Sequence, residues 1–339
     1  MRYRAKNIQS AVVAIASAAT CIVLASTSAA IPASAASGGQ EKFCSHAGSA
    51  PALATDSTTV RTAVGLSPPP TIPAAAWVIA DADTGAVLAE KNMRTRLKPA
   101  STFKVLTLLT LLSSGKPLDG VYTVTADDDA VEGSSAELAA GGVYTVEDLV
   151  HGLVLVSGND AAHAIANYGG GQAVFAQQMN RQASFVNASD TSAVNPSGLD
   201  DPGQCTTVRD MAQFFRAGLK NRKFKEIFSQ KEYLLPSGGR NVDGKADETY
   251  LIVSQNRLLM HGYPGILGGK TGFTDEAGRT FVAAAERDGR TLILAMFGFS
   301  SDTEETATAL FDWGFANRTP TANGETLPSL YWSPLLKLF

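Results

Sequence analysis

Residues 101–112 constrain the fold most, because they form a helix-length stretch that is apolar on nearly every side. A surface helix carries its apolar residues along one stripe, whereas a helix that is apolar all round is enclosed by protein. The stretch stops at Gly115, and glycine commonly follows the end of a helix. We therefore predict a helix at the centre of the molecule, covered by the remaining elements.

Strand signals lie on both sides of this central helix. Residues 77–80 and 86–89 flank an Asp-Thr-Gly turn, and residues 280–286 and 291–297 flank an Asp-Gly turn, so each pair predicts a β-hairpin. Further helices, the first with a capping pattern at Thr145, are predicted over residues 145–156, 160–167, 173–186, 208–219 and 303–315. Strands at both ends of a helical middle predict an α+β or mixed α/β fold, with an antiparallel sheet flanked by helices and a helical subdomain.

The first 35 residues have the pattern of a secretory signal peptide. Cations at positions 2, 4 and 6 precede an apolar run over 11–24, and residues 33–35 match the A-x-A cleavage pattern. The alternative is an uncleaved membrane anchor, but the apolar run is shorter than the ~20 residues of a full span. We therefore predict export, so that the mature protein is secreted into the cell envelope.

Composition divides the rest of the chain into three parts. Residues 36–75 are rich in Ser, Ala, Thr, Gly and Pro, which predicts a flexible spacer. Residues 76–318 carry the strand and helix signals and predict one folded domain, followed by a tail over 319–339. The apolar end of the tail is too short to span a bilayer and is interrupted by Pro334. We expect it to pack on the domain, and membrane attachment stays open.

Cysteine, histidine and charge content limit the chemistry that the chain can carry out. Cys44 and Cys205 remain after removal of the leader, and in an oxidising compartment they either form a disulfide or are two unrelated thiols. Three Cys and four His, with no C-x-x-C and no H-E-x-x-H, offer little material for a metal site, and no cofactor is expected. The formal net charge of −4 argues against a nucleic-acid partner.

Three short motifs occur in one order: S-x-x-K at 101–104, S-x-N at 157–159 and K-T-G at 270–272. Ser101 begins the central helix, where free N–H groups and the helix dipole favour an oxyanion. Lys104 lies one turn further on the same face, close enough to take the hydroxyl proton. Taken singly, the motifs could be a helix cap, a turn between helices and a strand end. Their combination in fitting contexts favours catalysis.

Two of the three motifs occur a second time in the chain. Residues 113–116 form another S-x-x-K, and residues 254–256 another S-x-N. Ser113 lies at the other end of the central helix, where the dipole has the wrong sign for an oxyanion. Ser101 is therefore the predicted nucleophile.

The three motifs and their surroundings resemble the low-molecular-weight penicillin-binding proteins, and more narrowly the serine-type D-alanyl-D-alanine carboxypeptidases. The resemblance covers residues 76–315 and is carried by the stretches 98–101, 144–149, 156–162, 195–200, 268–274 and 311–315. The alanine-rich composition and the spacer are similar to the actinobacterial branch. The resemblance implies the penicillin-binding protein/β-lactamase-like fold, peptidoglycan stem peptides as substrates and β-lactams as covalent inhibitors.

The resemblance also implies roles for residues on the helical side. Ser101 would attack the carbonyl between two D-alanines and form an acyl-enzyme, with Lys104 as general base. Ser157 would pass a proton to the leaving amine, and Asn159 would hold Lys104 and the substrate amide. Water would then hydrolyse the ester, without a metal or cofactor.

On the strand side, the resemblance implies that the K-T-G motif binds the substrate. Lys270 and Thr271, followed by Gly272, would bind the terminal carboxylate of the peptide. The backbone N–H groups of Ser101 and Phe273 would form the oxyanion hole.

A β-lactamase and a binding module are the alternatives to a carboxypeptidase. A class A β-lactamase uses the glutamate of an E-x-x-x-N loop between the second and third motifs, but Glu226, Glu232 and Glu248 are not followed by Asn at that spacing. A silent penicillin-binding or wall-binding module would have no use for an activated nucleophile. His151 and His163 lie near the S-x-N motif, and we interpret both as structural.

Overall fold

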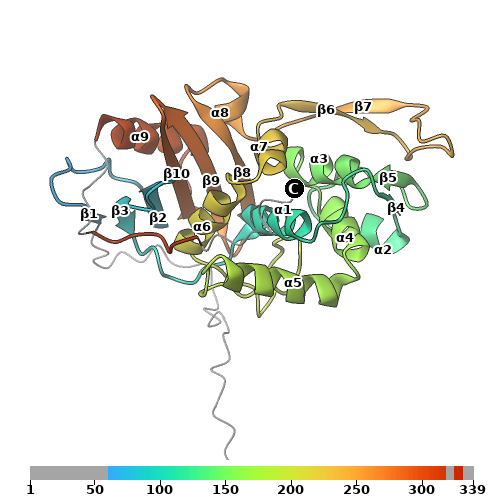
Figure 1. The fold of residues 1–339 in the computed structure, drawn as a ribbon, viewed down its shortest axis with the longest axis horizontal. Helices are drawn as coiled ribbons and strands as arrows, with labels where there is room; N and C mark the ends of the chain where they lie inside the picture. The colour runs from blue at the N-terminus through green and yellow to red at the C-terminus, as the bar shows by residue number, and fades with distance from the viewer. Residues whose placement is uncertain (1–59, 318–323, 331–339) are drawn as a thin grey trace, which may run out of the picture. The chain divides into compact units, whose positions relative to one another are not determined.

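The computed structural model describes residues 60–317 and 324–330, so the predicted signal peptide and most of the spacer lie outside the described residues. A six-stranded antiparallel sheet has the strand order β1-β3-β2-β10-β9-β8 (Figure 1). Its strands are β1 (Arg61–Thr62), β2 (Ala74–Asp81), β3 (Val87–Lys91), β8 (Ile266–Thr274), β9 (Gly278–Arg287) and β10 (Arg290–Phe299). Both predicted hairpins, β2–β3 and β9–β10, are confirmed.

Helices cover both faces of the sheet. On one face, α9 (Thr303–Ala316) and the short α8 (Arg257–Met260) pack with strand residues such as Phe281 and Leu294. On the other face, α6 (Val208–Gly218) packs with the intervening residues, such as Val282 and Ile293. The alternation follows from the two-residue period of a strand, and it confirms a sheet flanked by helices.

The predicted central helix is confirmed as α1 (Lys104–Ser113), in which residues 104–112 are all buried. Around it lie α3 (Val146–Leu155), α4 (Asn159–Tyr168), α5 (Gln172–Phe185), α6 and α7 (Arg222–Phe228). One detail differs from the prediction. Residues 100–103 form a 3₁₀ turn, η1 (Ala100–Phe103), so the regular α-helix begins at Lys104 rather than at Ser101.

The sequence did not predict several short elements. They are α2 (Ala126–Asp129), α7, α8, the pair β4 (Val121–Thr123) with β5 (Val143–Thr145), and the pair β6 (Glu232–Pro236) with β7 (Thr249–Val253). The β6–β7 pair begins near α7 and runs along α3 as a long ribbon (Figure 1). Elements of three to seven residues are too short to show a clear hydrophobic period, which explains the omission.

The boundaries of the predicted domain need correction at the N-terminal side. Residues 61–62, assigned to the spacer, form β1 and pair with β3, and Ile72 is buried. A Ser- and Pro-rich segment remains extended, which suits it to the edge of a sheet as well as to a linker. At the other end, Leu327 is buried and its N–H donates to the carbonyl of Gly85 at 2.7 Å, so residues 324–330 pack on the domain. The rest of the predicted tail, including its apolar end at 331–339, lies outside the described residues.

Three further points concern the cysteines and the surface. Cys205 is fully buried, but Cys44 lies outside the described residues, so their disulfide stays a prediction that non-reducing peptide mapping can test.

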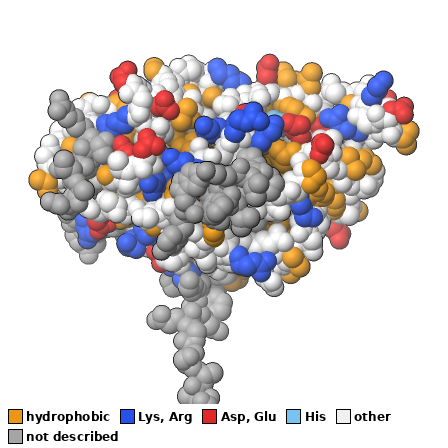
Figure 2. Space-filling view, in the orientation of Figure 1, with side chains coloured by type: hydrophobic (Ala, Val, Ile, Leu, Met, Phe, Trp, Pro, Cys, Tyr) orange, Lys and Arg blue, Asp and Glu red, His pale blue; other side chains and the backbone are white. Residues whose placement is uncertain are grey.

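In residues 60–317 and 324–330, no helix is long and apolar enough to cross a membrane. Positive and negative side chains are interspersed on the face shown in Figure 2.

Candidate active site

The three motifs meet at one place in the fold. Ser101 lies in η1, the S-x-N motif lies between α3 and α4, and the K-T-G motif lies on β8, the last strand of the sheet. A strand at the edge of a sheet leaves one side of its backbone without a partner strand. The motifs therefore surround a cleft between the sheet and the helical part of the molecule.

A capped helix start and a tight connection position the S-x-N motif. The Thr145 side chain accepts from the Asp148 backbone N–H while the Asp148 carboxylate accepts from Thr145, a capping box that begins α3. At the other end of α3, Ser157 adopts a φ of 65°, in the left-handed region. A Cβ on Gly158 would come within 2.5 Å of Asp160 Oδ1, so the close turn into α4 requires glycine.

Asp160 fixes the loop that lies over this connection. Its buried carboxylate accepts hydrogen bonds from the Ser135 hydroxyl and from the backbone N–H groups of Ala136 and Leu138, at 2.7–3.1 Å. The same loop provides the Glu132 carbonyl, which accepts from Asn159 Nδ2 at 2.6 Å. Asn159 is therefore held in one orientation by the loop.

Lys104 stands at the centre of the constellation and is fully buried. Its Nζ lies 2.9 Å from Ser101 Oγ, 2.7 Å from Asn159 Oδ1 and 2.7 Å from the carbonyl oxygen of Ser197. The predicted proximity of Lys104 to Ser101 is confirmed. The Ser197 carbonyl was not predicted, because a backbone acceptor about ninety residues away leaves no signature in the sequence near the lysine.

Burial lowers the pKa of the Lys104 amine well below the ordinary value for lysine. The positive charge of Lys270 lowers this pKa further, and the negative charge of Asp160 opposes the shift. A lowered pKa increases the share of the neutral amine, and only the neutral amine can accept a proton from Ser101.

The strand side of the cleft lies very close to the start of η1. A Cβ on Gly272 would be 2.7 Å from the backbone nitrogen of Ser101, so only glycine permits β8 to pass there. Thr102 Oγ1 and Thr280 Oγ1 both donate to the carbonyl of Pro99, at 2.6 and 2.9 Å. These two bonds fix the position of Ser101 relative to β9.

Lys270 occupies a different environment from Thr271. Its side chain is buried, its Nζ donates to the carbonyl of Thr271 at 2.9 Å, and burial lowers its pKa to about 7. Thr271, Gly272 and Phe273 instead line a pocket of about 350 Å³.

The pocket extends from Ser101 and Ser157 to α8 and the start of α9. Its wall also includes Asn256, Arg279 and Thr303. The Ser157 hydroxyl is buried and has no hydrogen-bond partner among the described residues. A hydroxyl in that position is ready to bond a substrate.

The second copies of the S-x-x-K and S-x-N motifs lie in different places relative to the pocket. Ser113 ends α1 on the surface, and the Lys116 amine donates to the carbonyl of Tyr168 rather than approaching Ser113. In the S-x-N copy, however, Asn256 lines the pocket and neither of its amide atoms has a partner among the described residues. No sequence pattern places α8 beside β8, so the position of Asn256 in the pocket was not predicted.

His151 lies outside the pocket wall and makes structural contacts. Its ring stacks on Tyr233 with centroids 3.9 Å apart, and its Nδ1 lies 2.7 Å from the Glu147 carbonyl oxygen. His163 is absent from the pocket wall as well. Within residues 60–317 and 324–330, no three His, Cys, Asp or Glu side chains are grouped so as to hold a metal ion.

Comparison of the sequence with known protein families identifies the family of this chain. The sequence profile of D-alanyl-D-alanine carboxypeptidases matches residues 63–301, which include all three motifs. The chain belongs to this family. It is a serine-type carboxypeptidase of the low-molecular-weight penicillin-binding protein class.

Individual relatives agree with this assignment. D-alanyl-D-alanine carboxypeptidase DacB2 of Mycobacterium tuberculosis is 42% identical over 261 residues, covering 74% of this chain and 86% of the relative. DacF of Bacillus subtilis is 32% identical over 246 residues, covering 70% of this chain and 61% of the relative. The solved structure of the Streptomyces K15 DD-transpeptidase superposes with a TM-score of 0.69 at 30% identity, covering 73% of this chain and 100% of that chain. The predicted fold class is therefore confirmed.

Proposed function

We propose that this carboxypeptidase is exported and removes the terminal D-alanine from peptidoglycan stem pentapeptides through an acyl-enzyme on Ser101. The observation that supports this most directly is the 2.9 Å contact between Lys104 Nζ and Ser101 Oγ in a fully buried setting. Export rests on the signal-peptide pattern of residues 1–35.

Acylation begins with proton transfer from Ser101 to the neutral amine of Lys104. Ser101 Oγ then forms a bond to the carbonyl carbon between the two D-alanines, and the electron pair of that carbonyl moves onto its oxygen. The backbone N–H groups of Ser101 and Phe273 stabilise the resulting oxyanion. The close passage of β8 over Ser101, which Gly272 permits, supports this pair of donors, because it brings β8 next to the Ser101 backbone nitrogen.

Collapse of this intermediate breaks the peptide bond and forms the ester. The leaving nitrogen receives a proton through the hydroxyl of Ser157, and D-alanine departs. Water then attacks the ester carbonyl, which releases the shortened peptide and returns the proton to Ser101. Asn159, held by the Glu132 carbonyl, keeps Lys104 oriented throughout.

Substrate specificity follows from the strand side of the cleft. Thr271 offers a hydroxyl at the pocket, and Lys270 contributes a buried amine behind it. Both groups favour a peptide that ends in a free carboxylate. A β-lactam carries a carboxylate beside a reactive amide, so we expect it to acylate Ser101 and inhibit the enzyme.

Three measurements on the mature protein test this function together. Release of D-alanine from a peptide ending in D-Ala-D-Ala supports the carboxypeptidase. Mass spectrometry after penicillin treatment should find the adduct on Ser101, and the adduct should persist for longer than a catalytic cycle on the peptide. Rapid penicillin hydrolysis without D-alanine release would indicate a β-lactamase. Labelling without either reaction would indicate a binding module.

A further inference from the structure

The pocket contains polar groups that the three motifs do not explain. Two of the described residues in its wall are arginines, Arg257 on α8 and Arg279 at the start of β9. An arginine remains charged at every physiological pH and binds carboxylates through two parallel hydrogen bonds. Either arginine could therefore receive an anionic part of a substrate, and their surroundings decide between them.

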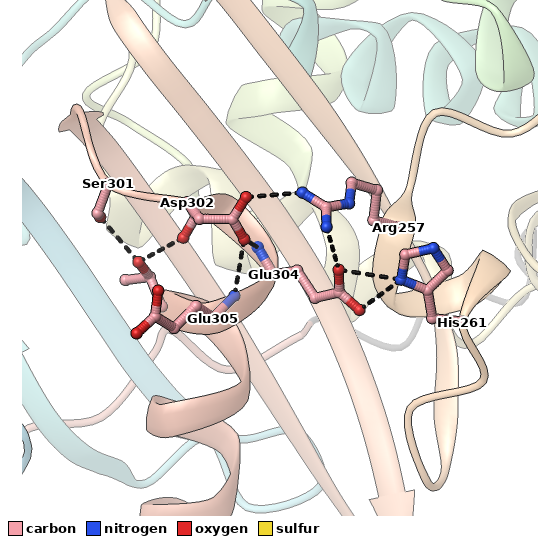
Figure 3. A network of polar contacts seen from close by, with 7 residues as sticks. Arg257, His261, Ser301, Asp302, Glu304 and Glu305 are labelled. Carbon is pink, nitrogen blue, oxygen red and sulfur yellow. Dashed lines mark hydrogen bonds and ion pairs between the residues drawn. The ribbon is translucent and has the colours of Figure 1, made fainter.

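Arg257 already forms ion pairs with carboxylates of the protein (Figure 3). Its guanidinium lies 2.6 Å from Asp302 Oδ2 and 3.0 Å from Glu304 Oε2. Glu304 is also bonded to His261 Nδ1 at 2.8 Å, and Asp302 caps α9 by accepting from the N–H groups of Glu304 and Glu305. The positive charge of Arg257 is thus neutralised within this network.

Arg279 has a different environment. It is exposed, and in the described parts of the chain it makes no hydrogen bond and no ion pair. It is therefore the one cation in the described pocket wall whose charge has no carboxylate beside it.

The register of the sheet places Arg279 beside the K-T-G motif. Thr271 pairs with Phe281, and Phe273 pairs with Arg279. Residues paired across antiparallel strands point to the same face, so Arg279 and Thr271 are diagonal neighbours on one face, with Cα atoms about 7–8 Å apart. The long arginine side chain can reach a group that is bound to the Thr271 hydroxyl.

Lys270 is on the other face of the same strand. Neighbouring residues on a strand point to opposite faces, and Lys270 pairs with Val282, which belongs to the core on the helical side. Its side chain is 1% exposed and is not part of the pocket wall. Lys270 can therefore act on a ligand in the pocket through its field, whereas direct contact has to come from groups on the face of Thr271.

We infer that Arg279 binds the C-terminal carboxylate of the peptide substrate directly, together with the hydroxyl of Thr271. This inference rests on the proposed function and adds a specificity-determining residue to it. The guanidinium donates two hydrogen bonds to the carboxylate, while Ser101 faces the carbonyl one residue back along the peptide. The bound substrate thereby supplies the anionic partner that Arg279 lacks in the free enzyme.

The experiment compares two peptides that differ only in their C-terminal group. Both end in D-Ala-D-Ala, one as the free carboxylate and the other as the amide, and cleavage of each is followed for wild type and Arg279→Ala. For the carboxylate peptide, kcat/KM should fall at least about tenfold, whereas for the amide it should change less than about twofold. Arg279→Lys should keep part of the selectivity, because it retains the charge but not the bidentate geometry.

A matched control is Arg181→Ala, which removes another exposed arginine without a partner in the described chain, on α5. It should leave both rates at the wild-type level. If Arg279→Ala keeps the wild-type ratio between the two peptides, the inference is wrong while the proposed function stands. If wild-type enzyme cleaves the bond between the two D-alanines in neither peptide, releasing neither D-alanine nor D-alaninamide, the proposed function itself is wrong and the role of Arg279 falls with it.

Discussion

The two walls of the cleft differ in how their polar groups are paired. On the helical wall, Asn159 uses both amide atoms, Oδ1 on Lys104 and Nδ2 on the Glu132 carbonyl. On the sheet wall, Asn256 has no partner for either amide atom and Arg279 has no counter-ion in the described chain. Around Lys104 the helical wall is thus assembled before the substrate arrives, with the Ser157 hydroxyl left open for it, whereas on the sheet wall the Asn256 amide and the Arg279 guanidinium are open.

This difference assigns different energetic consequences to the two walls. Preorganised groups around a nucleophile lower the barrier because they need no rearrangement during the reaction. A buried group without a partner, such as the Asn256 amide, has already lost its contact with water, so a ligand that bonds it gains more than it would at the surface. Substitutions on the helical wall should therefore affect stability and chemistry together, and substitutions on the sheet wall mainly the use of substrate.

The largest effect is expected for Ser101, the proposed nucleophile of the helical wall. Ser101→Ala should abolish penicillin labelling and lower kcat/KM at least about 10³-fold, because no other group can form the ester. Ser113→Ala is the matched control, since Ser113 begins the second S-x-x-K and lies exposed at the end of α1. Labelling that persists in the Ser101 variant, at a site mapped elsewhere, would remove Ser101 from the mechanism.

The next effect concerns the group that holds Lys104. Asn159→Ala removes an acceptor at 2.7 Å from Lys104 Nζ and leaves the Glu132 carbonyl without its donor. We expect kcat/KM to fall about 10²-fold and the free energy of unfolding to fall by about 1–3 kcal/mol. Peptide kinetics and urea denaturation of the same samples measure both. Full activity with unchanged stability would contradict the preorganised character of this wall.

Lys270 is on β8, with its side chain on the helical side of the sheet. Its substitution should have an intermediate effect on kcat/KM, and that effect should depend on pH. Its pKa of about 7 means that the ammonium form is present below pH 7 and is lost above it. For a peptide with a free carboxylate, kcat/KM should therefore decline as pH rises through about 7. The neutral form of Lys104 is needed for acylation, so its lowered pKa acts in the opposite direction and limits activity on the acid side.

Lys270→Ala should lower kcat/KM for the carboxylate peptide about tenfold, since a buried positive charge attracts the carboxylate through its field even without direct contact. The decline near pH 7 should disappear in this variant, and the discrimination against the amide peptide should shrink. A variant that keeps both the decline and the wild-type ratio would show that another group titrates there.

The sequence predicted the helical wall better than the sheet wall, and the reason is the distance along the chain between the partners. Ser101 and Lys104 are three residues apart, and Thr145 and Asp148 form their capping box within one turn, so the pattern itself contains the contact. The β9–β10 hairpin was predicted for the same reason, because its Asp-Gly turn joins adjacent strands.

The missed contacts involve short elements or distant segments. The Ser197 carbonyl reaches Lys104 from 93 residues away, and Asn256 enters the pocket on a four-residue helix that has no periodic pattern. Arg279 lies one residue before the strand predicted over 280–286, and its relation to Thr271 depends on the register between β8 and β9. Register of that kind is set by the packing of the whole sheet rather than by the residues of one strand.

The smallest effect is expected for Asn256, and it separates the two walls most cleanly because Asn256 and Asn159 are the same residue type. Asn256 is 3% exposed with no partner for its amide among the described residues, so the folded protein already bears the cost of removing that amide from water. Asn256→Ala recovers this cost but leaves a small cavity, and the two changes should nearly cancel, leaving the free energy of unfolding within about 1 kcal/mol of wild type. The kcat/KM for the carboxylate peptide should fall only a few-fold, because one neutral hydrogen bond to substrate is lost. Denaturation and peptide kinetics, run beside Asn159→Ala, test the contrast directly. If Asn256→Ala destabilises the protein as much as Asn159→Ala does, the amide of Asn256 has structural partners, and the contrast between the two asparagines is wrong.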